Sequence, residues 1–419
     1  MKKREILIVI ALILFGISYN AHKKGELNLS FSEGCNTNRM ALLDKKFPHD
    51  YVQADILKAN ITHIRIDNLA GNIVVEKTPD NQVRVQPTIR VYHKNPTKAD
   101  KLAKEISLLV RTAAVPGKTG ETLTLRVEPK HPFNYQRCRV YVKVLLPTGV
   151  DLDLRNSYGF IDITDCGGKV SIDQRHGDII ANKIASGLRI RNQYGDVTVN
   201  DAGALELTAM HCQVSLENIR NQALVTATTY SDLDITNTAR VSIDAKYSAI
   251  NVSNIKEGLS VKNSYETVYL ENVGGNINIA GTNCKVIINN AVCDTLTLRN
   301  SYKKVEIDGL SAKNVDIMLN HGRLDLAVDK IEDHIHIKNS YSDIAVAYPM
   351  HLNPFVTVDV RSGSIVNRTS QDMTLSRENG RSLLNSSRPE AKPQISVTNA
   401  YGDVKLEHTG QKTGQEVRL

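Results

Sequence analysis

Asn156-Ser157-Tyr158-Gly159-Phe160-Ile161-Asp162-Ile163 is a stretch that returns, altered but recognisable, down most of the 419-residue chain. With Tyr158 as the anchor, most equivalent positions follow one another at steps of 17 to 20 residues. The anchors are Tyr158, His176, Tyr194, His211, Tyr230, Tyr247, Tyr265, Asn283, Tyr302, His321, Tyr341, Ser362 and Tyr401. Self-similarity at a short, fixed period is the signature of a repeat protein.

Each repeat carries the same apolar frame, at six and four residues before the anchor and at three and five residues after it. For Tyr194 this frame is Leu188, Ile190, Val197 and Val199. Alternate side chains of a strand share a face, so each repeat holds two short strands with two same-face apolar residues each. One such unit cannot bury its apolar face alone, and stacked units bury a continuous core.

The repeats therefore predict an all-β fold, a parallel β-solenoid (β-helix) with coils of about 18 residues. An antiparallel sandwich is the alternative, but the repeats are alike in register, whereas a sandwich would have unlike strands. A second periodicity leaves the coil length open, because two residues before the anchor alternate repeats carry Asn156, Asn192, Thr228, Asn263, Asn300 and Asn339. Asparagine stacked on asparagine would favour a coil of about 36 residues. Ordinary strand and turn lengths favour 18.

The repeat array spans residues 150–367, and other segments flank it. Residues 61–149 form a β-rich, α+β-decorated N-terminal module, with strands expected at 106–111, 123–127 and 140–146 and one short helix at 98–105 capped by Thr97. After the array we expect a polar loop at 368–393, a last coil at 394–407 and a tail at 408–419.

The first residues carry a targeting signal. Lys2, Lys3 and Arg4 precede an apolar run at 6–17, which is shorter than the roughly 20 residues that span a bilayer. This pattern is typical of a secretory signal peptide. We interpret 1–21 as a signal peptide or, if it is not cleaved, a membrane anchor, and 22–60 as a polar tether. The expected location is the periplasm or cell envelope, with membrane contact only through 6–17.

The composition bears on two questions, nucleic-acid binding and the role of the cysteines. The net charge of +7 is spread thinly, and no basic tract marks a nucleic-acid interface. Six cysteines form no Cys-x-x-Cys motif. We expect them to be small buried apolar residues, with a Cys284–Cys293 disulfide as the alternative.

Residues from about 61 to 406 resemble the bacterial envelope putative-adhesin family, a β-strand-repeat domain of unknown function. The residues that carry this resemblance are Asp67-Asn68-Leu69-Ala70-Gly71-Asn72-Ile73, the insert with Lys98-Ala99-Asp100-Lys101, Leu145-Leu146-Pro147-Thr148-Gly149, and the units at 176–179, 194–197 and 401–404. The resemblance implies a β-helical, exported or membrane-attached protein, and it brings no catalytic residues. This chain departs from the family in placing Tyr or His where many members have Asn in the turn.

The Tyr/His line is the sharpest chemical feature and our candidate binding strip: Tyr158, His176, Tyr194, His211, Tyr230, Tyr247, Tyr265, Tyr302, His321 and Tyr341. Facing outward, it would form an aromatic strip for a glycan or protein partner. The alternative is that the rings stack at a corner of the coil for stability.

Other polar groups favour structural roles. His334 and His336 alternate with apolar residues and share a face, but a third metal ligand is not evident. The turn acids Asp178, Asp196, Asp232, Asp343 and Asp403 lack the glycine pattern of calcium-binding solenoids and are expected to stabilise turns. We predict no metal and no cofactor.

No nucleophile elbow, zinc motif or phosphate loop is present. The leading hypothesis is therefore a non-catalytic, exported β-solenoid that serves as an envelope scaffold or adhesion-type binding module. An exported carbohydrate-active β-helix enzyme is one alternative, because paired carboxylates from different coils leave no linear motif. A membrane-tethered envelope sensor or regulatory partner is another. The ligand and any self-association are left open.

Overall fold

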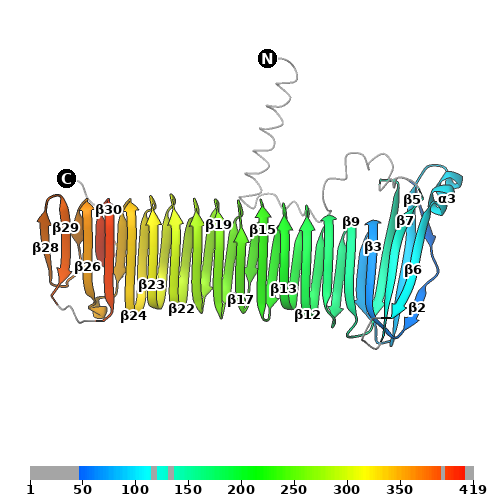
Figure 1. The fold of residues 1–419 in the computed structure, drawn as a ribbon, viewed down its shortest axis with the longest axis horizontal. Helices are drawn as coiled ribbons and strands as arrows, with labels where there is room; N and C mark the ends of the chain where they lie inside the picture. Colours follow the sequence, from blue (N-terminus) through cyan, green and yellow to red (C-terminus); the bar gives the residue numbers. More distant parts are fainter. Residues whose placement is uncertain (1–46, 115–119, 131–135, 388–391, 411–419) are drawn as a thin grey trace, which may run out of the picture.

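The computed structural model describes residues 47–114, 120–130, 136–387 and 392–410. In this part of the chain, successive coils pair as parallel strands at steps of 17 to 20 residues. The fold is therefore a parallel β-solenoid, drawn out into a straight rod (Figure 1). This confirms the coil of about 18 residues and excludes both the antiparallel sandwich and the 36-residue coil. The predicted signal peptide at 1–21 lies outside the described residues.

The array winds through two long sheets. Its strands are β9 (Asp151–Tyr158), β10 (Ile161–Cys166), β11 (Val170–His176), β12 (Ile179–Gln193), β13 (Val197–Met210), β14 (Gln213–Ile219), β15 (Gln222–Thr229), β16 (Asp232–Thr236), β17 (Arg240–Ala245), β18 (Ile250–Ile255), β19 (Gly258–Ser264), β20 (Thr267–Val273), β21 (Asn276–Thr282), β22 (Lys285–Ser301), β23 (Val305–Asn320), β24 (Leu324–Tyr341) and β25 (Ile344–Tyr348). The longest of these strands bend around a corner and contribute to both sheets.

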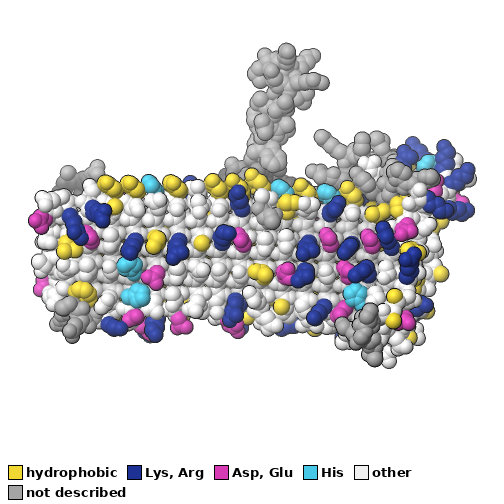
Figure 2. Space-filling view, viewed as in Figure 1, with side chains coloured by type: hydrophobic (Ala, Val, Ile, Leu, Met, Phe, Trp, Pro, Cys, Tyr) yellow, Lys and Arg dark blue, Asp and Glu magenta, His cyan; other side chains and the backbone are white. Residues whose placement is uncertain are grey.

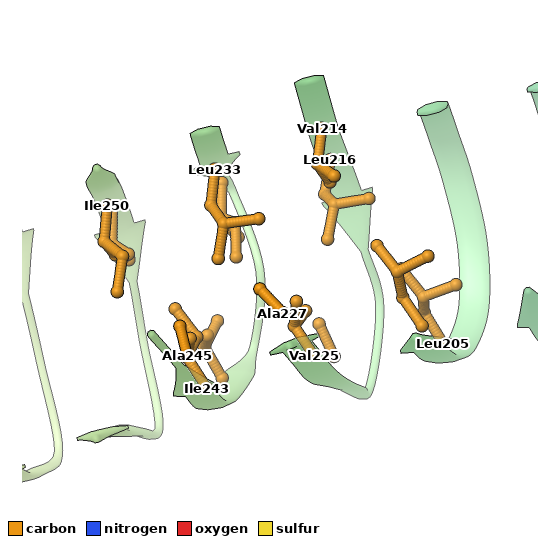
Figure 3. Packing of buried hydrophobic residues seen from close by; sticks show 14 of the residues in the cluster. Leu205, Val214, Leu216, Val225, Ala227, Leu233, Ile243, Ala245 and Ile250 are labelled. Atoms are coloured by element: carbon orange, nitrogen blue, oxygen red, sulfur yellow. The ribbon is translucent and has the colours of Figure 1, made fainter. Parts of the chain in front are cut away.

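The core lies between the two sheets. Apolar residues before each anchor come from one sheet and those after it from the other, as Leu188, Ile190 and Val197 show, all of them buried. In Figure 3, Val225 and Ile243 of one sheet face Leu216 and Leu233 of the other. This opposed packing is what the apolar frame predicts.

The coil before Tyr230 departs from the frame. Its register places Ala227 beside Ala209 but Thr229 beside Met210, so the coil carries one extra residue. Leu224, which the frame would turn inward, is consequently 44% exposed. Ala227 thus occupies the inward position before this anchor.

The N-terminal module caps one end of the rod. Its elements are β1 (Pro48–Val52), β2 (Ile56–Ala59), β3 (Ile61–Ala70), β4 (Ile73–Lys77), β5 (Gln82–Tyr92), α3 (Pro96–Lys104), β6 (Ile106–Ala114), β7 (Glu121–Pro129) and β8 (Cys138–Leu146). β3 lies between β7 and β9, and β4 lies between β8 and β10, all parallel. The coil formed by β3 and β4 comes first in the chain, but in the stack it lies between the coil of β7 and β8 and the coil of β9 and β10.

Antiparallel strands cover this end. β6 pairs with β7 and β5 pairs with β8, while β1 and β2 pair with β5. The predicted tether at 22–60 is therefore wrong for its described part, because residues from 48 onward form strands of the cap. The predicted cap of the helix is also wrong. The Asn95 side chain, not Thr97, accepts the hydrogen bond from Lys98 N at 3.1 Å, and Pro96 takes the first helical position.

The opposite end is built in a similar way. It contains a short 3₁₀ helix (Met350–Leu352), β26 (Phe355–Ser362), β27 (Ile365–Asn367), β28 (Met373–Glu378), β29 (Arg381–Ser386), β30 (Gln394–Tyr401) and β31 (Val404–His408). β30 lies between β24 and β26, and β31 lies between β25 and β27. The last coil of the chain is therefore inserted between two earlier coils.

The predicted polar loop at 368–393 contains a hairpin. β28 and β29 are antiparallel, and β29 pairs with the outer edge of β26. The sequence did not predict this hairpin, because its buried face carries two serines, Ser382 and Ser386, beside Leu384, instead of a row of apolar residues. The hairpin covers an edge that would otherwise present unpaired backbone groups.

Candidate functional site

One edge of the rod carries a row of stacked rings, which we call the ring ladder. Neighbouring ring centroids lie 4.2–5.6 Å apart and ring planes deviate from parallel by 3–17°. The ladder consists of Tyr158, His176, Tyr194, His211, Tyr230, Tyr247 and Tyr265 and, after Asn283, of Tyr302, His321, Tyr341 and Tyr401. The structure thus brings all residues of the predicted strip into one line. Tyr401 joins it because the inserted coil places its ring 5.0 Å from Tyr341.

The rings are both stacked and outward. The exposed fraction of the ladder tyrosines reaches 61% at Tyr230 and is 39% at Tyr194. Figure 2 shows such a row of yellow and cyan side chains along the upper edge of the rod. The sequence presented exposure and corner stacking as alternatives, and the structure combines them.

The backbone at this edge is unusual for such residues. From Tyr194 to His321 the anchors adopt left-handed φ values of 47–70°. This conformation is uncommon for residues other than glycine, asparagine and aspartate. In the earlier coils glycines follow the anchor, and a Cβ on Gly177 would collide with the carbonyl oxygen of Gly159. The coils therefore approach one another closely beside the ladder.

Stacking decides which ring atoms a partner can reach. Each ring face inside the ladder lies against its neighbour, so the ring edges, phenol hydroxyls and imidazole edges face solvent. These groups donate and accept hydrogen bonds. Flat stacking of a ligand requires an uncovered ring face, which the ladder offers only where a neighbouring ring is absent.

Buried amides support the ladder from inside. Asn263 donates to the carbonyl oxygen of Ser248 in the preceding coil at 2.8 Å and to that of Tyr265 in its own coil at 2.9 Å. Asn192, Asn339 and Asn399 likewise each donate to two successive turns. Because one amide serves two coils, an asparagine in every second coil is sufficient. This accounts for the 36-residue periodicity within an 18-residue coil.

The turn acids also link coils. The Asp178 carboxylate accepts the backbone N–H of Asp196 at 2.9 Å, and the Asp343 carboxylate accepts that of Asp403 at 3.0 Å. Hydrogen bonds from the backbone and hydroxyl of Ser364 lower the pKa of Asp403. For these acids, the expected turn-stabilising role is confirmed.

The remaining candidates are the histidines considered as metal ligands and the cysteines considered for a disulfide. His334 lies 3.7 Å from Asp316 and 3.4 Å from Asp333, and no group of three metal-ligating side chains occurs among the described residues. Cys284 and Cys293 are free and buried, so the alternative disulfide does not form. Burial raises the pKa of Cys293 to about 11, which disfavours the reactive thiolate.

Sequence reasoning did not single out a shallow apolar groove of about 630 Å³ on another corner of the rod. It crosses several coils and is lined in part by Leu152, Leu188, Leu205 and Leu224. Its lining also includes the small residues Gly187 and Ala204. Among the residues that the structure describes, no helix is long and apolar enough to cross a bilayer.

Comparisons with solved structures find chains of low identity. A putative cell adhesion protein from Clostridium sporogenes is 7% identical, covers 86% of this chain and 100% of its own, and has a TM-score of 0.19. A putative adhesin from Bacteroides fragilis is 10% identical, with 87% and 98% covered and a TM-score of 0.21. A putative adhesin from Parabacteroides distasonis is 8% identical, with 86% and 97% covered and a TM-score of 0.17.

A search of curated proteins finds no match. A family profile, in contrast, matches residues 61–262 and 238–407, which include the whole array and all of both caps except β1, β2 and the last residue of β31. This confirms the family resemblance expected from the sequence: the chain belongs to the Toastrack DUF4097 family, a domain of unknown function.

Proposed function

We propose that the protein is a non-catalytic, adhesion-type binding module of the bacterial cell envelope, and that the ring ladder is its contact surface. The partner is an envelope glycan or protein. The supporting observation is the choice of residues at two corners of the same coils. At the ladder corner, Tyr and His hold left-handed φ values. Seven residues further along, the second corner has the same conformation but carries Asp165, Lys183, Asp201, Asn218, Asn237, Asn254, Asn272, Asn290 and Gly309.

The second corner shows what the backbone prefers. Asparagine, aspartate and glycine adopt positive φ at low cost, and the second corner uses them in all of these coils except that of Lys183. The backbone conformation therefore does not explain the Tyr and His residues at the ladder corner, and we attribute their presence to the contacts that their rings make. The apolar core between the sheets does not include the rings. Tyr158 and Tyr247 are partly exposed, and 39–61% of the surface is exposed for Tyr194, Tyr230, Tyr265, Tyr302, Tyr341 and Tyr401. Exposed rows of aromatic residues are typical of interaction sites.

The repetition argues for contact rather than catalysis. A catalytic centre gathers different groups at one point, whereas the ladder presents the same groups coil after coil. A straight rod with a regular edge suits an extended partner. The proposed location is the periplasm or cell envelope, reached through the signal-like segment at 1–21.

The test is binding by the full chain to a bacterial glycan array and to solubilised envelope proteins. A ladder variant combines Tyr194→Asn, Tyr230→Asn and Tyr302→Asn, because asparagine tolerates the left-handed backbone. A matched control replaces two exposed apolar residues away from the ladder, Leu224→Ser and Val292→Ser.

We expect the wild type and the control to bind the same partner and the ladder variant to bind at least tenfold more weakly. Circular dichroism must show that all three are folded. No binding by the wild type, or equal loss in ladder variant and control, would overturn the proposal.

A further inference from the structure

The ring ladder is interrupted in one coil. Asn283 takes the anchor position between Tyr265 and Tyr302, while stacking continues on either side, with Tyr247 4.7 Å from Tyr265 and His321 5.3 Å from Tyr302. This is the one break in the row from Tyr158 to Tyr401, all of which lies in the described part of the chain.

The backbone is not disturbed there. Asn283 has a φ of 58°, between the values of other anchors. Its N–H donates to the carbonyl oxygen of Ser301 at 3.0 Å, and the N–H of Tyr265 donates to that of Thr282 at 2.8 Å. The coil therefore keeps its place in the stack, and only the ring is missing.

The missing ring leaves a slot. Coils are spaced about 4.8 Å apart, so two coils separate Tyr265 from Tyr302 by roughly 10 Å. One ring can enter this space at the ladder's own stacking distance on both sides. An asparagine side chain ends at about the depth where a tyrosine ring begins, so the Asn283 amide lies at the base. The two walls are open to solvent, with Tyr265 41% and Tyr302 56% exposed.

We propose that this slot binds one pyranose ring of a glycan, held between the faces of Tyr265 and Tyr302. The assignment rests on the proposed function and specifies its ligand and site. A pyranose presents C–H groups on its faces, and the negative face of an aromatic ring attracts such positive edges. Its hydroxyls project around the rim, where polar protein groups can reach them.

The surroundings favour a sugar over an aromatic side chain. The Asn283 amide at the base can both donate and accept hydrogen bonds. Glu266 and Lys303, both exposed, follow the two wall residues directly and add an acceptor and a donor of opposite charge. Apolar walls with a few convergent polar groups are the pattern of a specific small-ligand site. A purely apolar occupant would leave these polar groups without use.

The decisive variant is Asn283→Tyr, which fills the slot and completes the ladder. It should remain folded, with an equal or higher melting temperature, because it adds two stacking contacts. The matched control is Asn290→Tyr, which adds the same ring to the same coil at the other left-handed corner, where φ is 55°. Tyr265→Asn removes one wall and retains a residue suited to positive φ.

The probes are methyl glycosides of glucose, galactose, mannose and N-acetylglucosamine, with N-acetyltyrosinamide as the aromatic competitor. Saturation-transfer NMR on the full-length variants measures binding. We expect at least one glycoside to bind the wild type and Asn290→Tyr, and at least tenfold weaker binding by Asn283→Tyr and Tyr265→Asn.

The other outcomes separate this inference from the proposed function. A glycoside that binds Asn283→Tyr as well as the wild type overturns the slot but leaves the ladder as a binding edge. Binding of N-acetyltyrosinamide alone, sensitive to Asn283→Tyr, overturns the sugar and points to a protein partner. If none of these probes binds, although the glycan-array test identifies a glycan whose binding depends on the ring ladder, the slot is again overturned.

Discussion

At the scale of single residues, each inward-facing asparagine amide links two coils by hydrogen bonds. Asn263 bridges two turns, and Asn192 and Asn300 do the same. The sequence revealed the periodic asparagines but suggested that they stack on one another. Spacing alone does not show which backbone group a side chain contacts, so the two-turn hydrogen bonds could be found only in the structure.

Replacing Asn263 by alanine should destabilise the protein by about 1–3 kcal/mol, because it removes the amide donor from the buried bond to the Ser248 carbonyl oxygen and leaves the Tyr265 carbonyl oxygen with the weaker Cys284 thiol as donor. The measurement is the urea midpoint of unfolding. Asn278→Ala is the matched control, since Asn278 lies exposed on β21, and it should change the free energy of unfolding by less than about 0.5 kcal/mol. Equal effects of the two changes would contradict the bridging role.

The inward and outward positions of one strand give a second test. Val305 is fully buried, whereas the neighbouring Glu306 is partly exposed and forms an ion pair with Lys304 at 2.7 Å. Val305→Asp places a charge in the core and should cost more than about 3 kcal/mol or abolish folding. Glu306→Lys loses a surface pair and should cost about 1 kcal/mol at most. Similar thermal unfolding of the two variants would refute the assignment of faces.

At the scale of elements, the apolar frame was predictable because alternation and stacking leave few solutions. The frame around Tyr194 or Tyr302 fixed two strands, their inward residues and the coil length. It could not show the extra residue before Tyr230, because a single insertion does not change the average period. It also missed the hairpin β28–β29, where serines take buried positions that usually carry apolar residues.

This hairpin should be sensitive to acid. Arg381 contacts Asp359 of β26 at 2.8 and 2.7 Å, and it lowers the pKa of that carboxyl group. A carboxyl whose pKa is lower in the folded state contributes stability above its unfolded pKa and loses it as the pH falls through the folded value. The contribution should therefore be present at neutral pH and decline below about pH 4.

Hydrogen-exchange protection factors of β28 and β29, corrected for intrinsic rates, should fall between pH 6 and pH 3 relative to the central array. Asp359→Asn should lower protection at pH 6 and remove most of this pH dependence. Glu378→Gln is the control, since the Glu378 carboxylate has no ion pair among the described residues. If Asp359→Asn behaves like the control, the pair does not hold the hairpin.

At the scale of the whole molecule, the order of coils in space differs from their order in the chain at both ends. The coil at β3–β4 and the coil at β30–β31 each lie one place inward from the outermost coil. The sequence could not predict this exchange. Every coil carries the same frame, so local pattern does not specify which coil is its neighbour.

Deleting residues 394–419 should therefore release more than the deleted segment. Without β30 and β31, β26 and β27 lose their parallel neighbours, and the hairpin, which pairs with β26, loses its connection to the array through β30. We expect residues from about 349 onward to become sensitive to protease while the array up to β24 stays resistant, as read by mass spectrometry of the fragments. A chain shortened after Gly410 is the control and should digest like the wild type. Protection of β26 in the longer deletion would contradict the role of the inserted coil.

The exchanged ends also determine how the rod responds to tension. A strand at the open end of a stack can be peeled away one neighbour at a time. β30 has parallel partners on both edges, so a pull on the C-terminal segment must break two rows of backbone hydrogen bonds together. β3 has the same protection at the other end. In a rod held at one end and loaded at the other, β1 and β2, which pair with β5, would come away first. Further unravelling would then be resisted at β3 as it is at β30, so the chain topology is suited to bearing mechanical force.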